Sequence, residues 1–327
     1  MNRNISLSVV ALLALGLFLP QVLSAQEIVA AAPASSASTN PVEIGTVKWS
    51  RDLDAAYASS KKTGKPVFLL FQEVPGCQGC QEFGRKVLSQ PLLVEAIEDE
   101  FVPVVVFNNR SSGKDKELLD QFKEPAWNYQ VIRFLDGDGK DIVKRKQGIW
   151  SIDGVAKRMI ETLEKQQRPV PNYLKTIRAV TDKSSHDQAA FAMHCFWTGE
   201  YRLGGIEGVV STEAGWLDGR EVTLVNYDKE RISLDSLAKK ASQVRCADKV
   251  YTKTGSSLAG LVGGKLDSSY RAASSSDQKK QLSRWDAITQ VPSINSMQLT
   301  KINSLAPKSR EAALQWLSPR QRASLGK

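Results

Sequence analysis

The chain has 327 residues, of which 42% are hydrophobic and 24% are charged, and this balance excludes a wholly disordered chain, a coiled coil and a collagen. The formal net charge is +9, but the tightest basic cluster is only Lys144 to Lys146, so we expect a solvated basic surface and no nucleic-acid partner. The chain contains two His residues, which disfavours a His-ligated metal site and a Ser-His-Asp triad. The length suggests about two domains.

Residues 1–25 have the pattern of a secretory signal peptide. A positive charge near the start precedes an apolar run at 5–19 that is too short for a convincing membrane anchor, and Ser24-Ala25 suits cleavage. The alternative is that this segment is not cleaved and anchors the protein in a membrane. Residues 26–45 are rich in Ala, Ser and Pro, which is typical of a tether. We therefore expect a periplasmic or secreted protein that is not embedded in a membrane after cleavage.

The four cysteines are Cys77, Cys80, Cys195 and Cys246. In an oxidising compartment an even number often indicates structural disulfides, and four cysteines can pair in three ways. A chain of this size does not need such links to fold, so the surroundings of each cysteine must decide its role.

The first module, residues 46–165, is predicted to alternate helices with short strands. The patterns predict helices at 52–62 and 91–101, strands at 67–71, 102–107 and 131–135, and a tight turn at 136–139. Another helix is expected to follow Cys80. A strand-helix-strand order implies a parallel or mixed sheet that is covered by helices.

Cys77-Gln78-Gly79-Cys80 lies at a predicted strand-to-helix junction. The free N–H groups and the dipole at a helix N-terminus stabilise a thiolate, so the first sulfur is expected to be reactive. Cys80, one turn further on, can resolve a mixed disulfide. A structural disulfide and half of a zinc site are the alternatives. No second C-x-x-C exists, so we expect no metal ion.

The order of a Lys-Pro pair, a buried strand and C-x-x-C resembles the thioredoxin-like family, from about Trp49 to Arg145. The resemblance implies a thioredoxin-like sandwich in which Cys77 attacks and Cys80 resolves. Gln130 stands at the position that we align with the proline of that family, which argues against general disulfide exchange with many partners.

Residues 166–187 contain two prolines and a polar cluster, and we interpret them as the link to a second module at 188–327. Strands are predicted at 189–193, 208–211 and 221–228, followed by a helix that Ser233 caps. Cys246 falls just beyond that helix. The polar residues 275–327 are expected to be helical and to carry no chemistry.

Four segments of the second module follow one another along the chain: Cys195-Phe196-Trp197 with Glu200, Gly208-Val209 with Ala214-Gly215-Trp216, Glu221 to Asp228, and Ser269-Tyr270-Arg271. In these motifs and in their order, residues 189–282 resemble the peptide methionine sulfoxide reductase A family. The resemblance implies a methionine sulfoxide reductase A-like α/β domain with a helical C-terminal extension. The whole chain is then predicted to combine α/β and α+β classes.

The resemblance also implies a role for individual residues. The Cys195 thiolate attacks the sulfoxide sulfur and Glu221 donates a proton to the leaving oxygen. Cys246 is the local candidate to resolve the resulting sulfenic acid, and Cys77 is the distant one. The implied substrate-binding residues are Phe196, Trp197, Trp216 and Tyr270. Glu200 is expected on a helix surface or as a cap.

The main hypothesis is therefore an exported enzyme that reduces methionine sulfoxide, peptide-bound and of the S-epimer, with the C-x-x-C module as electron relay. Its partners would be oxidised proteins or peptides and a membrane-delivered thiol reductant, and it would need no cofactor besides thiol electrons. A thioredoxin-like disulfide reductase with a degenerate, docking C-terminal domain is the alternative. The second alternative is not an enzyme: it is a binding module that is held together by Cys77–Cys80 and Cys195–Cys246 disulfides.

Overall fold

The computed structural model describes residues 40–124, 126 and 130–326. The predicted signal peptide, residues 1–25, and most of the predicted tether, residues 26–45, lie outside the described residues. A short 3-10 helix, η1 (Val42–Ile44), opens the described part of the chain.

The first sheet has four strands in the order β2-β1-β3-β4. Their bounds are β1 Val67–Gln72, β2 Val102–Phe107, β3 Gln130–Leu135 and β4 Asp141–Gln147. β1 pairs in parallel with β2 and antiparallel with β3, so the sheet is mixed, as predicted. Every residue of β1 is buried because helices cover both faces of the sheet, which explains its continuous apolar sequence.

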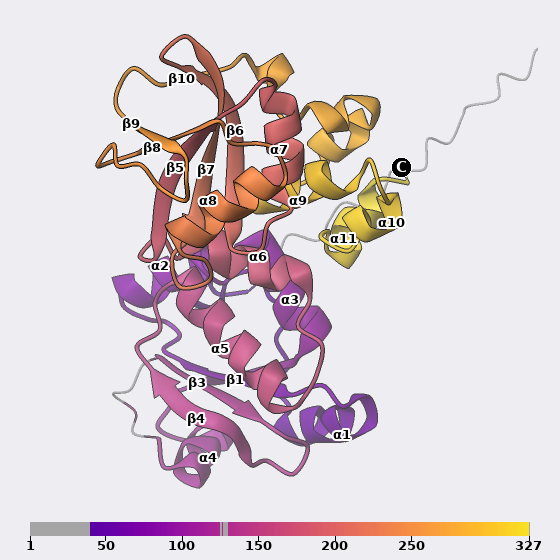
Figure 1. The fold of residues 1–327 in the computed structure, drawn as a ribbon. Helices are drawn as coiled ribbons and strands as arrows, with labels where there is room; N and C mark the ends of the chain where they lie inside the picture. The colour runs from indigo at the N-terminus through magenta and orange to yellow at the C-terminus, as the bar shows by residue number, and fades with distance from the viewer. Residues whose placement is uncertain (1–39, 125, 127–129, 327) are drawn as a thin grey trace, which may run out of the picture. The chain divides into compact units, whose positions relative to one another are not determined.

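Helices cover both faces of this sheet (Figure 1). They are α1 Leu53–Thr63, α2 Gln78–Lys86, α3 Pro91–Glu100, α4 Gly113–Phe122, α5 Ile152–Lys165 and α6 Asn172–Thr181. α1 and α4 pack on the face that carries Leu69 and Val104, and the other four pack on the face that carries Phe68 and Ile132. The predicted α/β sandwich is confirmed.

Part of the segment predicted as a link, residues 166–187, forms helix α6. Tyr173, Leu174 and Ile177 on this helix are buried in the core of the first domain, beside α3 and α5. The prolines that suggested a link precede the helix, where proline is compatible with a helix start. The helical spacing of Tyr173, Leu174 and Ile177 would have predicted this helix, but the two prolines favoured the interpretation as a link.

The second sheet has six strands in the order β10-β6-β7-β5-β8-β9. Their bounds are β5 His186–Ala192, β6 Val209–Leu217, β7 Arg220–Asp228, β8 Lys249–Thr252, β9 Val262–Lys265 and β10 Arg271–Ala272. Helices α7 (Phe196–Gly204) and α8 (Leu234–Gln243) pack on one face of it (Figure 1). Ser233 caps α8 as predicted, because its hydroxyl accepts a hydrogen bond from Ser236 N.

The C-terminal residues form short helices, as the sequence predicts. They are η2 Ser275–Asp277, η3 Lys280–Arg284, η4 Asp286–Gln290, α9 Ser296–Leu305, α10 Arg310–Leu314 and α11 Pro319–Ser324. The N-terminus of α11 reaches the first domain. There the buried carboxylate of Glu95 on α3 accepts hydrogen bonds from Ser318 Oγ (2.6 Å) and Arg320 N (2.7 Å). The described residues accordingly belong to a single compact unit.

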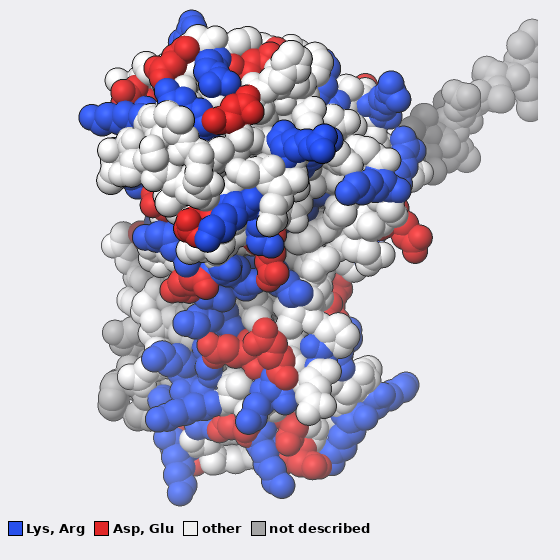
Figure 2. Space-filling model, in the orientation of Figure 1, with Lys and Arg blue, Asp and Glu red and all other residues white. Residues whose placement is uncertain are grey.

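The surface drawn in Figure 2 mixes Lys and Arg with Asp and Glu, so the positive charge on this face is not gathered into one field. A bilayer-spanning helix needs about 20 apolar residues. The longest helix in the described ranges, α5, has 14 residues, and no helix there meets that requirement.

Gly84 allows α2 to approach η1, and its replacement by Ala is expected to destabilise the first domain. A Cβ atom at position 84 would overlap the carbonyl oxygen of Val42 and the backbone of Glu43, which cannot move away cheaply. Such overpacking costs about 1–3 kcal/mol. Urea denaturation measures the effect. Gly79→Ala is the control, since its Cβ would meet only Cys77 Sγ at 3.7 Å; equal losses in both variants would contradict the expectation.

Candidate functional site

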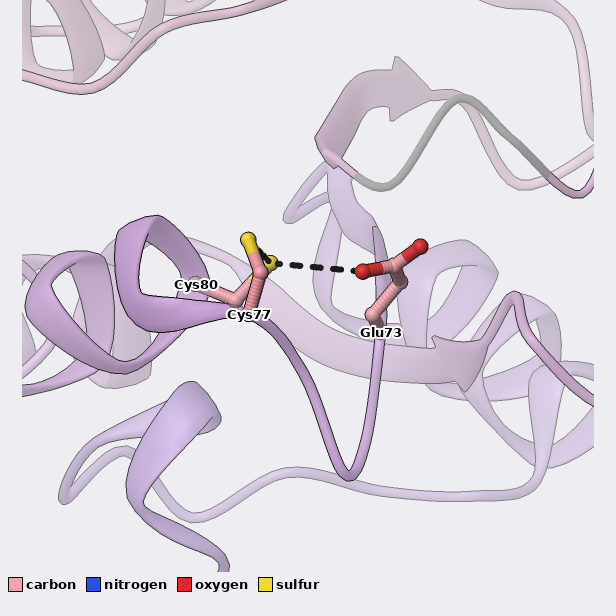
Figure 3. A group of neighbouring side chains, drawn as sticks. All are labelled: Glu73, Cys77 and Cys80. Atoms are coloured by element: carbon pink, nitrogen blue, oxygen red, sulfur yellow. Dashed lines mark hydrogen bonds between the residues drawn. The ribbon is translucent and has the colours of Figure 1, made fainter.

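The C-x-x-C pair lies at the start of α2. Cys77 is the N-cap of this helix and is exposed, whereas Cys80 is fully buried in its first turn. Both cysteines are free thiols, with their Sγ atoms 3.4 Å apart (Figure 3). The predicted strand-to-helix junction is therefore present, although α2 begins directly after the first cysteine.

The two sulfurs differ strongly in acidity. The hydrogen bond from the backbone N–H of Cys80 lowers the pKa of Cys77, and it outweighs the opposing effect of burial, with help from the Cys80 thiol and Gly79 N–H. Burial raises the pKa of Cys80 to about 12, and its thiol hydrogen bond to Cys77 adds to this. A thiolate at Cys77 and a thiol at Cys80 suit an attacking and a resolving sulfur respectively.

This asymmetry predicts the pH dependence of alkylation. In the reduced chain, Cys77 should still react with iodoacetamide at pH values below the ordinary thiol pKa of 9.0, and its rate should fall only as the pH drops through its lowered pKa. Cys80 should stay protonated and slow up to pH 9.0 and beyond. Mass spectrometry of timed samples measures both rates. Equal rates at the two positions, with a common midpoint near 9.0, would contradict the prediction.

Glu73 is a residue of this site that the sequence analysis missed. It comes from the loop directly after β1, and its Oε2 lies 3.9 Å from the Sγ atom of Cys80, which donates to it (Figure 3). The signal that could have found it is an acidic residue at the end of a buried strand, four positions before the first cysteine. In open α/β sheets, ligands bind outside the carboxyl ends of the strands, and Glu73 lies at such an end.

Cys195 is the N-cap of α7, and its side chain is half-buried. It makes no capping hydrogen bond of its own. The carboxylate of Glu221 on β7 takes that place, since Oε2 accepts a hydrogen bond of 2.8 Å from the backbone N–H of Phe196. The structure therefore brings Glu221 to the residue next to Cys195, at the positive end of a helix.

Cys246 lies beside the first turn of the same helix. It is buried, and its Sγ is 3.8 Å from the carbonyl oxygen of Thr198, to which it can donate. Burial raises the pKa of Cys246, while the charge of Arg202 and a hydrogen bond from it act in the opposite direction. Cys195 is near enough to contribute to that shift. Three of the predicted catalytic side chains thus surround the start of α7.

Three aromatic side chains border this site. Phe196 is buried, and its ring meets Trp216 edge-on at 5.6 Å and Trp197 at 6.1 Å between centroids. Trp197 and Trp216 are 36% and 39% exposed, so they offer an apolar surface to solvent. Trp216 lies directly across the hairpin from Glu221, because the strands turn in only two residues, Asp218 and Gly219.

Tyr270 does not join this group. Its ring packs against Gly215 and its hydroxyl donates a 2.6 Å hydrogen bond to Glu213. Both residues lie on the opposite face of β6 from Trp216, because side chains alternate along a strand. The tyrosine also belongs to the small core on the sheet face away from α7. The structure therefore places Tyr270 on the other face of the sheet from Cys195 and does not bring the two residues together.

Glu200 also differs from expectation, since it lies in the protein interior instead of on a helix surface. It is fully buried in α7, where Oε1 accepts from Lys279 Nζ (2.5 Å) and Oε2 accepts from Lys279 N (2.6 Å). This ion pair joins α7 to the start of the C-terminal extension. The described hydrogen bonds of Glu200 are to Lys279 and Thr212, and none is to Cys195.

Among the described residues, no hydrogen bond joins the C-x-x-C pair to Cys195 or Cys246. The structure therefore contains two separate thiol sites, one at the start of α2 and one at the start of α7.

Comparison with known proteins finds similarity to two kinds of redox protein. A family model described as thioredoxin-like matches residues 48–136. The peptide methionine sulfoxide reductase MsrA of Pseudomonas syringae pv. tomato strain DC3000 is 41% identical in an alignment of 73 residues that covers 17% of this chain and 34% of the relative, so the chain spans about a third of that protein. A solved oxidoreductase, DsbH, covers 42% of this chain and 96% of its own, with 20% identity and a TM-score of 0.31.

The chain therefore contains a thioredoxin-like redox domain together with a partial similarity to a methionine sulfoxide reductase.

Proposed function

We propose that this chain, with its thioredoxin-like first domain, is a thiol-redox enzyme that reduces methionine sulfoxide in oxidised proteins or peptides. The acting sulfur is Cys195, and the C-x-x-C pair returns the second domain to its reduced state. The partial likeness to MsrA supports the substrate class and, through that family, the S-epimer.

The main observation that supports the proposal is the position of Glu221. Its carboxylate caps α7 by accepting a hydrogen bond from the backbone N–H of Phe196, the residue next to Cys195. A sulfoxide sulfur is electrophilic, but its oxygen leaves only when it is protonated. A sulfur nucleophile at a helix N-terminus and a carboxyl group beside it supply the two functions that this step requires. Because Phe196 N–H holds Oε2, the other oxygen of Glu221 is the one available for proton transfer.

The first step balances as follows. The Cys195 thiolate attacks the sulfoxide sulfur, Glu221 delivers one proton to the oxygen, and the oxygen ends on Cys195. The products are methionine and a sulfenic acid at Cys195, so the sulfoxide is reduced by two electrons while the cysteine is oxidised by two. Trp197 and Trp216 offer the apolar surface on which the methyl group and side chain of the substrate can rest.

The second step uses Cys246. Its thiol condenses with the sulfenic acid, which releases water and forms a Cys195–Cys246 disulfide. The Cys77 thiolate then attacks this disulfide, and Cys80 closes its own disulfide and frees the second domain as a dithiol. An external dithiol must finally reduce the Cys77–Cys80 bond.

Export belongs to the same proposal. We place the mature protein in the periplasm or outside the cell, with electrons supplied by a membrane-delivered thiol reductant. The apolar segment at 5–19 and the small residues at 24–25 support it. N-terminal sequencing of the protein secreted by its native host tests the cleavage, and an intact N-terminus on a membrane-bound chain would overturn it.

A single-turnover experiment tests the chemistry. The fully reduced chain is mixed with a methionine sulfoxide peptide in the absence of a reductant, and the peptide product and the disulfides are analysed by mass spectrometry. We expect methionine to form in stoichiometric amount, together with a disulfide that involves Cys195. No methionine, with all four thiols still free, would refute the proposal.

The position of Tyr270 favours a second candidate. A domain that lost its tyrosine from the site could serve only to dock a partner, and the chain would then be a disulfide reductase or electron carrier. Reduction of insulin disulfides that requires Cys77 and is unaffected by Cys195→Ser would support this candidate.

A further inference from the structure

Glu73, Cys77 and Cys80 form a group of metal-binding side chains at the start of α2. One ligand atom from each residue lies within 4.8 Å of the other two. Figure 3 shows the Glu73 carboxylate, on the loop after β1, directed at the two sulfurs. In the described ranges, no other group of three His, Cys, Asp or Glu residues has this spacing.

The distances fit a tetrahedral ion. Zinc bonds of about 2.3 Å to sulfur and about 2.1 Å to a carboxylate oxygen place two sulfurs about 3.8 Å apart and a sulfur and an oxygen about 3.6 Å apart. The observed separations are 3.4 Å for the two Sγ atoms and 3.9 Å between Cys80 Sγ and Glu73 Oε2. Both separations lie within about 0.4 Å of the values for a tetrahedral site.

The backbone around the group is already fixed. Gly76 N donates to the buried Glu43 carboxylate (2.9 Å) and Val74 N donates to the side-chain oxygen of Asn109 (3.3 Å), so the loop that carries Glu73 is held at both ends. Position 76 has no Cβ, and one there would contact Cys80. Because these groups are held in place, an ion would not have to order the loop.

We propose that the reduced C-x-x-C site binds one Zn²⁺ through Cys77 Sγ, Cys80 Sγ and a Glu73 oxygen, with water in the fourth position. Two thiolates and one carboxylate suit zinc, which accepts sulfur and oxygen ligands together. Magnesium and calcium require oxygen ligands, and monovalent copper prefers sulfur alone. Cys77 is exposed, which leaves room for the water.

The ion would control the redox chemistry of the first domain. Binding displaces the thiol protons and holds both sulfurs as zinc thiolates. A coordinated Cys77 sulfur is not free to attack a disulfide, so the zinc-bound chain is reduced but inactive until the ion is removed. Affinity should rise with pH because the ligands must lose protons.

Titration of the reduced full-length chain tests this proposal. Competition with a chromophoric chelator measures Zn²⁺ affinity, and Cd²⁺ reports thiolate ligands through its charge-transfer absorption. We expect one ion per reduced chain and none after Cys77–Cys80 oxidation. Even the loss of a residue that only hydrogen-bonds a metal ligand lowers metal affinity about 10–100-fold. Because Cys77 and Glu73 would bind the ion directly, Cys77→Ser and Glu73→Gln should each lower the Zn²⁺ affinity at least tenfold.

Two controls locate the ion. Glu82→Gln changes an exposed carboxylate on the same helix and should leave the affinity unchanged. The double variant Cys195→Ser/Cys246→Ser should also retain full binding. If Glu73→Gln behaves like Glu82→Gln, or if the double variant removes the ion, the proposed site is wrong. These titrations involve no sulfoxide, so their outcome is independent of the proposed enzymatic activity.

Discussion

Replacement of Cys195 by Ser is expected to reduce the turnover of a methionine sulfoxide peptide to the uncatalysed background. A hydroxyl at this position is neither ionised nor nucleophilic enough to attack the sulfoxide sulfur. The measurement is steady-state formation of methionine with dithiothreitol as the reductant, which bypasses the first domain. A Cys195→Ser chain with wild-type turnover would exclude the proposed nucleophile.

Glu221→Gln separates the acid from the nucleophile. The amide keeps an oxygen that can accept from Phe196 N–H, so α7 should stay capped, but it cannot donate a carboxyl proton. General acid catalysis contributes about 10²–10⁴-fold, and we expect a loss of that size in kcat. Glu230→Gln, an exposed change after the same strand, is the matched control. Equal rates for the two variants would remove Glu221 from the mechanism.

Glu200→Ala is expected to produce the largest loss of stability in the second domain. The change leaves the Lys279 ammonium without its carboxylate, in a site where Glu200 is fully buried. Removal of one partner of a buried ion pair costs about 3–5 kcal/mol. Urea denaturation followed by tryptophan fluorescence measures the effect, since Trp197 lies in the affected helix.

A paired replacement and an exposed pair serve as controls. In Glu200→Leu/Lys279→Met no charge remains unpaired, so this variant should recover most of the loss. The exposed pair Glu82–Lys86 on α2 should contribute little to stability, because solvent screens its charges. A Glu200→Ala chain as stable as a Glu82→Ala chain would show that the buried pair does not hold α7.

Local patterns predicted most of the fold. β2 is an almost continuous apolar run, β7 alternates between buried and less buried residues, and Ser233 places a capping hydroxyl directly before a periodic helix. Each of these features is visible within a few residues of sequence. Helix α6 was missed because Pro169 and Pro171 indicate a boundary, and they do stand before the helix.

The site was less predictable because it depends on long-range placement. Tyr270 reaches the sheet through β10, and no local pattern shows on which face of β6 it will pack. Glu73 is an isolated acidic residue in the sequence, and only the fold shows that α2 places two sulfurs beside its carboxylate. Glu200 looks like an ordinary helical carboxylate until Lys279, on a distant segment, is placed beside it.

The hydrogen bonds between α11 and Glu95 have a consequence for folding. They join residues 223 and 225 positions apart, so the last helix completes a closed loop that includes most of the chain. Closing a longer loop adds little entropic cost, so this link can be stable although the contact is remote. Loss of α11 would leave the Glu95 carboxylate buried without these donors. The thioredoxin-like portion and the C-terminal end are therefore expected to melt in a single cooperative transition, and a fragment that stops before residue 318 should melt at a lower temperature.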